Sequence, residues 1–262
     1  MLRIPPDTLI AEADAISARE LPLSGPWFGY CGTHLYNRAP ADTDVSAFSW
    51  RLPTLFYLFR KLGIMQSEKA KQRTHALAKR LELEDLSLRH EHERHILINV
   101  CKVLNDIKLP GIVAGYAPIR GEVDALKMLT ALYQQGFEIA LPIVRKDCEN
   151  RLEFGVHHPD AELLEGYSGI LEPLPERDVV LPRVLLVPLL GFNANCHRLG
   201  YGAGHYDRTL AYFKKIHHKV TTIGLAFEFQ KNKDIIVEAH DQPLDYVVTE
   251  KHIYNRYGGD KH

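Results

Sequence analysis

The sequence has few cysteines and no pattern that would pair them. Four occur in 262 residues, and no two have the Cys-x-x-Cys spacing of zinc ribbons or redox pairs. This argues against a zinc framework and a disulfide scaffold, so we expect reduced thiols. The four are Cys31, Cys101, Cys148 and Cys196.

An excess of charge and a long apolar run are also missing. The 32 Lys and Arg residues offset 33 Asp and Glu residues, for a formal net charge of −1. This balance argues against a general nucleic-acid or membrane-surface binder. No apolar run reaches the roughly 20 residues of a membrane span, and Pro5-Pro6 interrupts any secretory leader. We therefore expect a cytoplasmic protein, a monomer, whose partners are small molecules.

Internal repeats, low-complexity tracts and the zinc-protease motif are absent too. The segment His90–His95 contains three histidines, but a zinc-protease helix needs histidines four residues apart. The residue four after His90 is Arg94. We interpret the segment as a solvated, charged helix face.

What the sequence does contain is a glycine-rich loop between an apolar run and an amphipathic one. Val184–Leu190 reads as a strand and Thr209–Ile216 as a helix. Between them Gly200, Gly202 and Gly204 alternate, so no Cβ keeps a ligand away from the backbone. Successive N–H groups before a helix can cradle phosphate oxygens.

Two charged residues flank these glycines. Arg198 can bind phosphate oxygens, and Asp207 can hold Mg²⁺ beside them. No lysine follows as in a P-loop, and His205 replaces the last glycine of a dinucleotide fingerprint. The alternative is a glycine-rich surface turn. We favour a nucleotide polyphosphate site.

The first 64 residues differ in style from the rest. Prolines and glycines interrupt them without helical or strand periodicity, and both tryptophans, Trp27 and Trp50, lie there. Met65 to Lys69 reads as a natural start, with Ser67 as a helix cap. We expect residues 1–64 to be a poorly ordered extension, either mistranslated upstream sequence or an addition of one lineage. Residues 65–262 would form a single domain.

Strands and helices are expected to alternate along that domain. This order predicts an α/β fold, an open, mostly parallel sheet covered by helices on both faces. Ligands of such sheets bind beyond the carboxyl ends of the strands. We expect helices over 67–83, from a cap at Ser87, and over 124–133, and strands over 112–116, 137–141, 184–190, 220–224 and 246–249.

Several motifs together resemble one family. The glycine loop, Arg198-Leu-Gly-Tyr-Gly-Ala-Gly-His-Tyr-Asp-Arg, is similar to that of the 5-formyltetrahydrofolate cyclo-ligase (methenyltetrahydrofolate synthetase) family. The likeness runs over most of residues 65–262. Its other motifs follow the family's order, and they are Lys69–Arg80 with its Lys-x-x-x-Arg, Tyr116–Asp124, Gly136–Pro142, Ile223–Phe227 and His240–Glu250.

The resemblance implies an ATP- and Mg²⁺-dependent ligase of folate metabolism. It would convert 5-formyltetrahydrofolate to 5,10-methenyltetrahydrofolate and release ADP and phosphate. Arg198 and Asp207 would be catalytic, and Asp207 and Asp241 would hold the metal. ATP would be bound by Lys69, Arg73, Arg198, Leu199, Gly200, Tyr201, Gly202, Ala203, Gly204, His205 and Tyr206. Folate would be bound by Arg73, Ala117, Glu122, Tyr201, Gly202, Ala203, Gly204 and His205.

Some of these assignments depend on the resemblance alone. Lys69 and Arg73 are four residues apart and share a helix face, but so could any solvated bases, and we interpret Lys71, Lys79 and Arg80 in that way. The other reading of Glu122 is an acid that eases the dipole of the next helix, a role that Asp124 fits better.

Two positions depart from the family. Some members have lysine at the position of Ala203, and tyrosine is frequent at that of His205, so the folate contacts there would change.

Two other classes of function stay open. One is a non-catalytic nucleotide- or folate-binding relative that serves regulation. The other is a sugar-phosphate isomerase or CoA-transferase relative with the same architecture. The joint presence of Lys69, Arg73, Arg198 and Asp207 favours the ligase.

Overall fold

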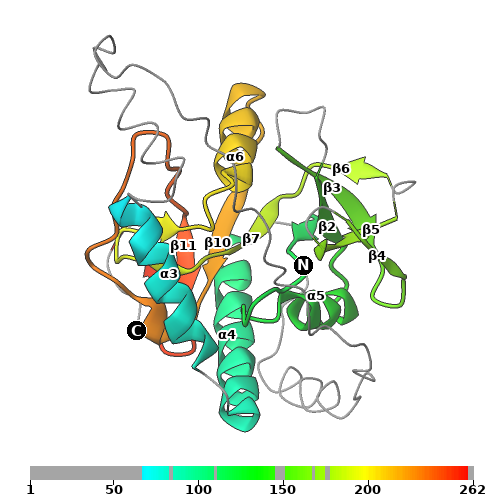
Figure 1. Cartoon of the computed structure of the whole chain (residues 1–262). Helices are drawn as coiled ribbons and strands as arrows, with labels where there is room; N and C mark the ends of the chain where they lie inside the picture. The colour runs from blue at the N-terminus through cyan, green and yellow to red at the C-terminus, as the bar shows by residue number, and fades with distance from the viewer. Residues whose placement is uncertain are drawn as a thin grey trace, which may run out of the picture. The chain divides into compact units, whose positions relative to one another are not determined.

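The computed structural model describes residues 67–82, 85–108, 111–144, 151–166, 169–174 and 178–258. The predicted extension, residues 1–64, lies outside these ranges, as do Cys31 and Cys148. Figure 1 shows a large sheet with helices packed on it. The helices are α3 (Glu68–Leu81), α4 (Leu86–Ile107), α5 (Ala125–Gln134) and α6 (His205–Lys215).

The main sheet has eight strands in the order β12-β11-β10-β7-β1-β2-β3-β6. The five strands from β11 to β2 are parallel, and β12, β3 and β6 are antiparallel to their neighbours. The bounds are β1 (Val113–Ala114), β2 (Ile139–Val144), β3 (Leu152–His157), β6 (Val179–Val180), β7 (Val184–Pro188), β10 (Thr221–Leu225), β11 (Tyr246–Val248) and β12 (Ile253–Asn255).

The five parallel strands are those that the sequence predicts, and the α/β class is confirmed. Most of their residues are apolar and buried, so the strands are covered on both faces, as parallel strands require. Along β7, Val184 and Leu186 pack into one core cluster, and Leu185 and Val187 pack into another. Neighbouring side chains point to opposite faces of the sheet, so one strand supplies both cores.

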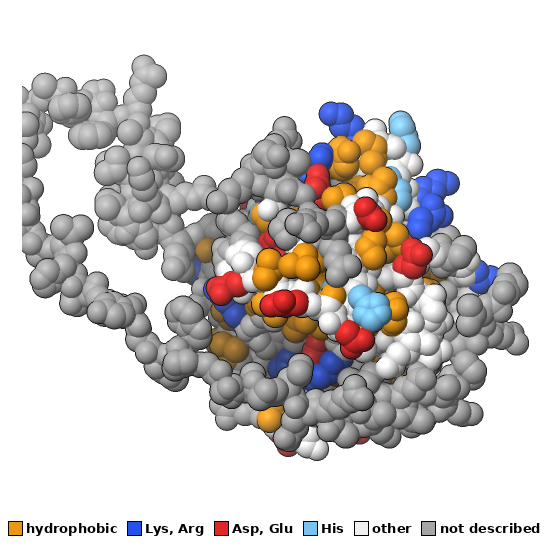
Figure 2. Space-filling view, turned by 90° about the vertical axis from the view of Figure 1, so that its right-hand side faces the viewer, with side chains coloured by type: hydrophobic (Ala, Val, Ile, Leu, Met, Phe, Trp, Pro, Cys, Tyr) orange, Lys and Arg blue, Asp and Glu red, His pale blue; other side chains and the backbone are white. Residues whose placement is uncertain are grey.

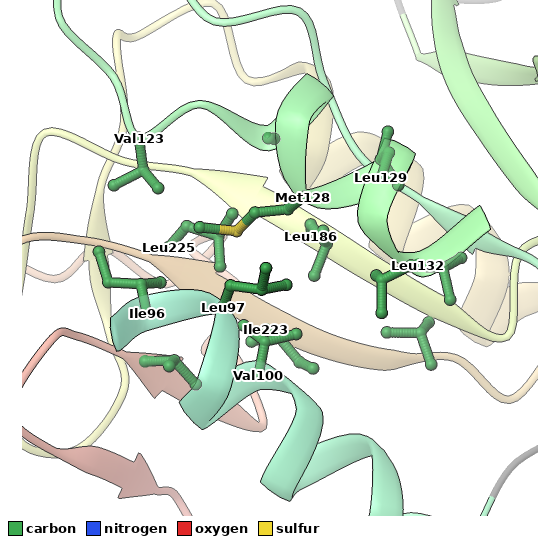
Figure 3. Close-up of a cluster of buried hydrophobic side chains, with 14 of the residues drawn as sticks. Ile96, Leu97, Val100, Val123, Met128, Leu129, Leu132, Leu186, Ile223 and Leu225 are labelled. Carbon is green, nitrogen blue, oxygen red and sulfur yellow. The ribbon is translucent and has the colours of Figure 1, made fainter. Parts of the chain in front are cut away.

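Helices cover both faces of the sheet, as predicted. On one face α4 and α5 supply Ile96, Val100 and Met128 to a cluster with Leu186 and Ile223 (Figure 3). On the other face α6 contributes Leu210 and Phe213. Within the sheet, the chain steps in one direction from β1 to β2 and in the opposite direction from β7 to β10. Both crossovers keep the same hand, so their helices, α5 and α6, lie on opposite faces of the sheet.

The chain reverses direction in the sheet between β1 and β7. In a doubly wound sheet this switch point, at the carboxyl ends of the two strands, is where ligands bind. The loop after β1 and the glycine loop both begin there. A hairpin of β8 (Gly191–Phe192) and β9 (Arg198–Leu199) separates the glycine loop from β7. Leu190 N donates to Leu199 O, which returns the chain to the end of β7.

The far end of the sheet carries a second small hairpin, formed by β4 (Leu163–Glu165) and β5 (Leu171–Pro173). Both strands expose a leucine, Leu164 and Leu171. Figure 2 looks onto this side of the molecule, where apolar and acidic side chains predominate at the centre. A nucleic-acid surface has the opposite, basic character.

Two local predictions are wrong. Asp85, and not Ser87, caps α4, because its carboxylate accepts hydrogen bonds from Ser87 N and Leu88 N. The segment His90–His95 is not fully solvated either. Its Glu93 is buried and accepts hydrogen bonds from Arg89 Nε and Asp124 N, which anchors α4 to the start of α5.

Two further observations concern the thiols and the helices. Cys101 and Cys196 are buried, and burial raises the pKa of the Cys101 thiol to about 12. Among the described residues, no helix is long and apolar enough to cross a membrane.

Candidate active site at the switch point

The glycine loop lies between β9 and α6. Gly204 precedes α6 with φ 72°, and Gly202 has φ 102°, a conformation that L-residues rarely adopt. No side chain caps the N-terminus of α6. Glycine therefore sets the turn, and a helix N-terminus with its partial positive charge follows it.

Arg198 and Asp207 form an ion pair across this loop. Arg198 Nη2 donates to Asp207 Oδ1 over 2.7 Å, and its Nη1 donates to Gln242 O over 2.7 Å. Asp207 Oδ1 also accepts from Gln242 N over 3.0 Å. Arg198 is buried, so this pair is little screened by water. The pair joins the start of β9, the first turn of α6 and the segment before β11.

Helix α3 brings two basic residues to the same place. Arg73 Nε donates to Gly200 O over 2.9 Å, and its guanidinium packs against Gly202. Lys69 is buried, and its Nζ donates to Asp241 Oδ2 over 2.6 Å and to Glu238 Oε2 over 3.0 Å. The shared helix face predicted for Lys69 and Arg73 therefore meets the glycine loop and the loop before β11.

Asp241 lies in a cluster with two residues that sequence reasoning missed. Ligand atoms of Glu238, His240 and Asp241 all lie within 4.8 Å of one another. Partial burial raises the pKa of Asp241, but hydrogen bonds from Lys69 and from Glu238 N outweigh it and lower that pKa. The hydrogen bond from Lys69 likewise lowers the pKa of Glu238. Both carboxyls are thus held ionised beside one ammonium group.

Glu122 follows β1 and is buried. Its Oε2 accepts from Ile119 N over 2.9 Å, and its Oε1 is buried without a hydrogen-bond partner among the described residues. Burial raises the pKa of Glu122, and the Ile119 amide, the Tyr201 hydroxyl and the Arg80 charge offset this only in part. An unpaired buried oxygen is costly, so this atom is suited to a donor from a ligand. The role suggested for Asp124 is confirmed, because its side chain caps α5.

A model of the 5-formyltetrahydrofolate cyclo-ligase family matches residues 65–250. The chain belongs to this family. The 5-formyltetrahydrofolate cyclo-ligase of Escherichia coli strain K12 is 36% identical over 146 residues, which cover 54% of this chain and 79% of the relative. That of Haemophilus influenzae is 28% identical over 185 residues, which cover 69% and 97%.

Solved structures agree with the family assignment. The 5,10-methenyltetrahydrofolate synthetase of Aquifex aeolicus has a TM-score of 0.62 and 30% identity, and the match covers 75% of this chain and 96% of that one. The synthetase of Mycoplasma pneumoniae has a TM-score of 0.55 and 23% identity over 70% of this chain and 99% of that one, which supports the fold alone.

Within this family's fold, most of the predicted site residues come from three segments at the switch point. Ala117 and Glu122 lie in the loop after β1, the glycine loop follows β9, and Lys69 and Arg73 come from α3. Leu199 differs, because its side chain is buried with Leu190 and Ile235. Leu199 can therefore offer a nucleotide only its backbone. His205 begins α6, and the ring of Tyr206 packs against the core.

Arg80 is the main residue that sequence reasoning misjudged. The sequence predicts a solvated base like Lys71 and Lys79, and those two are indeed exposed. Arg80 is only 1% exposed. The available signal was its spacing, since Arg80 lies seven residues after Arg73 and eleven after Lys69, on the same helix face.

Proposed function

We propose that this protein catalyses the ATP-dependent cyclisation of 5-formyltetrahydrofolate to 5,10-methenyltetrahydrofolate, with release of ADP and phosphate. The observation that carries the proposal is the meeting of α3, the glycine loop and the loop before β11 at the switch point of a cyclo-ligase-family fold. Lys69 and Arg73 come from α3, Arg198 from β9 and Asp207 from α6, and their hydrogen bonds join these elements to the glycine loop and the loop before β11. We also propose that the enzyme works as a cytoplasmic monomer.

The nucleotide side of the site is the glycine loop with its two arginines. The phosphates would lie against the loop backbone and the N-terminus of α6, where amides and the helix dipole favour negative charge. Arg73 is already placed by its bond to Gly200 O, and Arg198 by its bonds to Asp207 and Gln242 O. A preplaced guanidinium loses little freedom when it binds a phosphate.

Asp207 and Asp241 are the proposed magnesium ligands. Their chemistry fits, because Mg²⁺ prefers oxygen and commonly takes one or two carboxylates plus substrate phosphates. Gln242 follows Asp241 in sequence and donates its N–H to Asp207, which ties the two aspartates together. Bound Mg²⁺ would neutralise charge on the phosphates. Lys69 now bridges Asp241 and Glu238, so it would turn toward the nucleotide as the carboxylates change partner.

The reaction needs little acid–base chemistry from the protein. The formyl oxygen attacks the γ-phosphorus, and the bond to the ADP oxygen breaks. N10 then attacks the activated formyl carbon, the phosphorylated oxygen leaves as phosphate, and the N10 proton is lost to water. Positioning and charge neutralisation supply most of the rate of such a transfer. A site made of glycines, arginines and carboxylates has these capacities.

The folate side is proposed to lie at the loop after β1. Oε1 of Glu122 would accept N–H groups of the pterin ring, which would give this buried atom the partner that it lacks. Ala117 lies in the same loop and is buried, and it would contact the folate through its backbone. The folate would thus be held by β1 and the nucleotide by β9 and α6, on the two sides of the switch point.

Purified protein tests the proposal directly. With ATP, Mg²⁺ and 5-formyltetrahydrofolate, near-ultraviolet absorbance should rise as the conjugated methenyl product forms, and phosphate should appear in equal amount. A control without ATP should show no change. Folate binding without phosphate release would instead support a regulatory relative and would overturn the catalytic proposal.

A further inference from the structure

Arg80 makes hydrogen bonds to three separate segments at the switch point. Its Nε donates to Arg120 O over 3.0 Å, in the loop after β1. Its Nη1 donates to Leu189 O over 3.1 Å, directly after β7. Its Nη2 donates to the Tyr201 hydroxyl in the glycine loop. One side chain of α3 therefore joins the proposed folate loop, the end of the central strand and the proposed nucleotide loop.

The charge of Arg80 is unusual for so buried a group. Guanidinium stays protonated in proteins, and a buried charge is normally paired. Among the described residues, no carboxylate oxygen lies within 4.0 Å of the Arg80 guanidinium, so Arg80 forms no ion pair with them. Glu122 is the carboxyl whose pKa the Arg80 charge lowers.

Tyr201 connects the two groups. Its ring lies between two guanidinium groups, with Arg80 Cζ 5.6 Å and Arg120 Cζ 6.0 Å from the ring centroid. Its hydroxyl accepts from Arg80, and a hydrogen bond from the same hydroxyl lowers the pKa of Glu122. Because a hydroxyl can accept and donate at once, the order Arg80, Tyr201, Glu122 forms a directed chain.

We propose that Arg80 is a positioning residue for the folate. It holds the Tyr201 hydroxyl and the backbone at Arg120, and so sets where Glu122 presents its unpaired Oε1 to the N–H groups of the pterin ring. This inference rests on the proposed function and adds a residue to its folate side. Arg80 touches neither the phosphates nor the reacting atoms in this role, so ATP binding depends on it only weakly.

The competing role is structural. Arg80 would then only fasten α3 to two backbone carbonyls, and the Tyr201 hydroxyl would be incidental. Leu189 O supports part of this role, because it also accepts from Gln230 Nε2 over 3.2 Å and is a fixed point of the fold. The two roles differ in what happens when the hydroxyl alone is removed.

Tyr201→Phe is the variant that separates the two roles. It keeps the ring between the two arginines and leaves both backbone bonds of Arg80 in place. Arg80→Lys keeps the charge but cannot reach three acceptors in three directions. If Arg80 positions the folate, both variants raise KM for 5-formyltetrahydrofolate at least tenfold. They change KM for ATP less than twofold, because the backbone of Tyr201, which is its part in the proposed phosphate cradle, is unchanged. The double variant is then little worse than either single one.

A pH profile gives a second readout. Removing the hydroxyl removes a hydrogen bond that lowers the pKa of Glu122, so the acid limb of kcat/KM for the folate should move to higher pH. The other titratable groups that face Glu122 are Tyr116, Arg120, Tyr206 and Arg80, and all four are unchanged in Tyr201→Phe. If the role of Arg80 is only structural, the acid limb of the kcat/KM profile should not shift.

The experiment uses full-length enzyme, with Lys79→Ala as the matched control. Lys79 precedes Arg80 on α3 but is exposed, so its removal should leave both KM values unchanged. Calorimetric binding of 5-formyltetrahydrofolate without ATP is measured in parallel. If wild-type protein gives no product, the proposed function fails, and calorimetry still tests Arg80. Wild-type folate affinity in Tyr201→Phe, or equal rises in both KM values, would overturn the positioning role.

Discussion

At the residue scale, the site contains carboxyl groups in two contrasting environments. Asp207 has a buried arginine for a partner and accepts two hydrogen bonds on one oxygen. Glu122 accepts a backbone hydrogen bond on one oxygen, and its other oxygen is buried without a hydrogen-bond partner among the described residues. A carboxylate whose position is fixed by such bonds can serve as a metal ligand, and one with an unpaired oxygen is suited to accept a ligand proton donor.

Asp207→Asn should lower turnover by about a hundredfold or more, because the amide weakens the metal that neutralises phosphate charge. It also leaves Arg198 without a counter-charge, so we expect a stability loss of about 1–3 kcal/mol. Steady-state rates and thermal midpoints measure both effects. Asp234→Asn, on an exposed loop, serves as control. Near-normal rates of Asp207→Asn at saturating Mg²⁺ would show that the metal assignment is wrong.

Glu122→Gln should stabilise the free protein and weaken folate binding. Burial raises the pKa of Glu122, so the folded state prefers the protonated form. Protonated Glu122 contributes to the stability of the fold below the ordinary pKa of 4.5, and this contribution is lost as pH rises through the higher pKa of the folded state. The gain in thermal midpoint should therefore grow from pH 5 upward and then level off.

Near neutral pH we expect the thermal midpoint of Glu122→Gln to lie about 2–4 °C above that of wild type, which is the shift that about 1 kcal/mol causes in a domain of this size. Glu91→Gln on the exposed face of α4 is the control and should change neither the midpoint nor folate affinity. An unchanged folate affinity in Glu122→Gln would contradict the role of this residue.

At the element scale, the glycine loop and α3 hold the two sides of the nucleotide site together. Arg73 crosses from the helix to Gly200 O, and its guanidinium fills the space beside Gly202. Two glycines of one loop therefore have different tasks. Gly202 sets the backbone and leaves room for Arg73, whereas a Cβ on Gly200 would meet no atom within 4 Å.

This difference allows a paired test. Gly200→Ala should leave the free protein as stable as wild type and weaken ATP binding at least tenfold, because its methyl group would enter the space left for phosphate. Gly202→Ala should weaken ATP binding too, and in addition its free energy of unfolding should fall by about 1–3 kcal/mol, since φ at this position is 102° and the new Cβ would lie 3.2 Å from Arg73 Cζ. Thermal unfolding and nucleotide titration check both. Wild-type ATP affinity in Gly200→Ala would exclude the loop as the phosphate cradle.

Whether a helix or strand can be predicted from the sequence depends on how many residues show its pattern. The five parallel strands are predicted because each is part of a continuous apolar run, and α5 because Asp124 and Gly136 mark its ends. Strands β8 and β9 have two residues each, too few to show any periodicity. Their hairpin exists because Leu190 and Leu199 pack together and bond through their backbones, which is a tertiary effect.

At the scale of the whole molecule, the family match and the first described helix begin at nearly the same place. The match begins at residue 65 and α3 at Glu68. All the predicted site residues, from Lys69 to Asp241, lie within the matched range. The sequence before it, which lies outside the described residues, contains both tryptophans.

A chain that begins at Met65 should fold and should convert 5-formyltetrahydrofolate at the full-length rate, with a thermal midpoint within about 2 °C, because about 1 kcal/mol shifts a domain of this size by 2–4 °C. Its fluorescence should come from tyrosine alone, since Trp27 and Trp50 are removed. Both chains are measured side by side. A large drop in rate or midpoint would mean that the first 64 residues belong to the working enzyme.

The fold class and the position of the glycine loop were predictable from the sequence, because they depend on local patterns of apolar and glycine residues, whereas Lys69 and Arg73 were singled out by the resemblance to the family. Only the tertiary structure decided that Lys69 meets Asp241, 172 positions away, and that Arg80 is buried. Lys69 meets the loop before β11, and Arg80 meets carbonyls that follow β1 and β7, and these groups come together only once the sheet has formed. A helical pattern shows which side chains share a face, but it does not show what that face will meet.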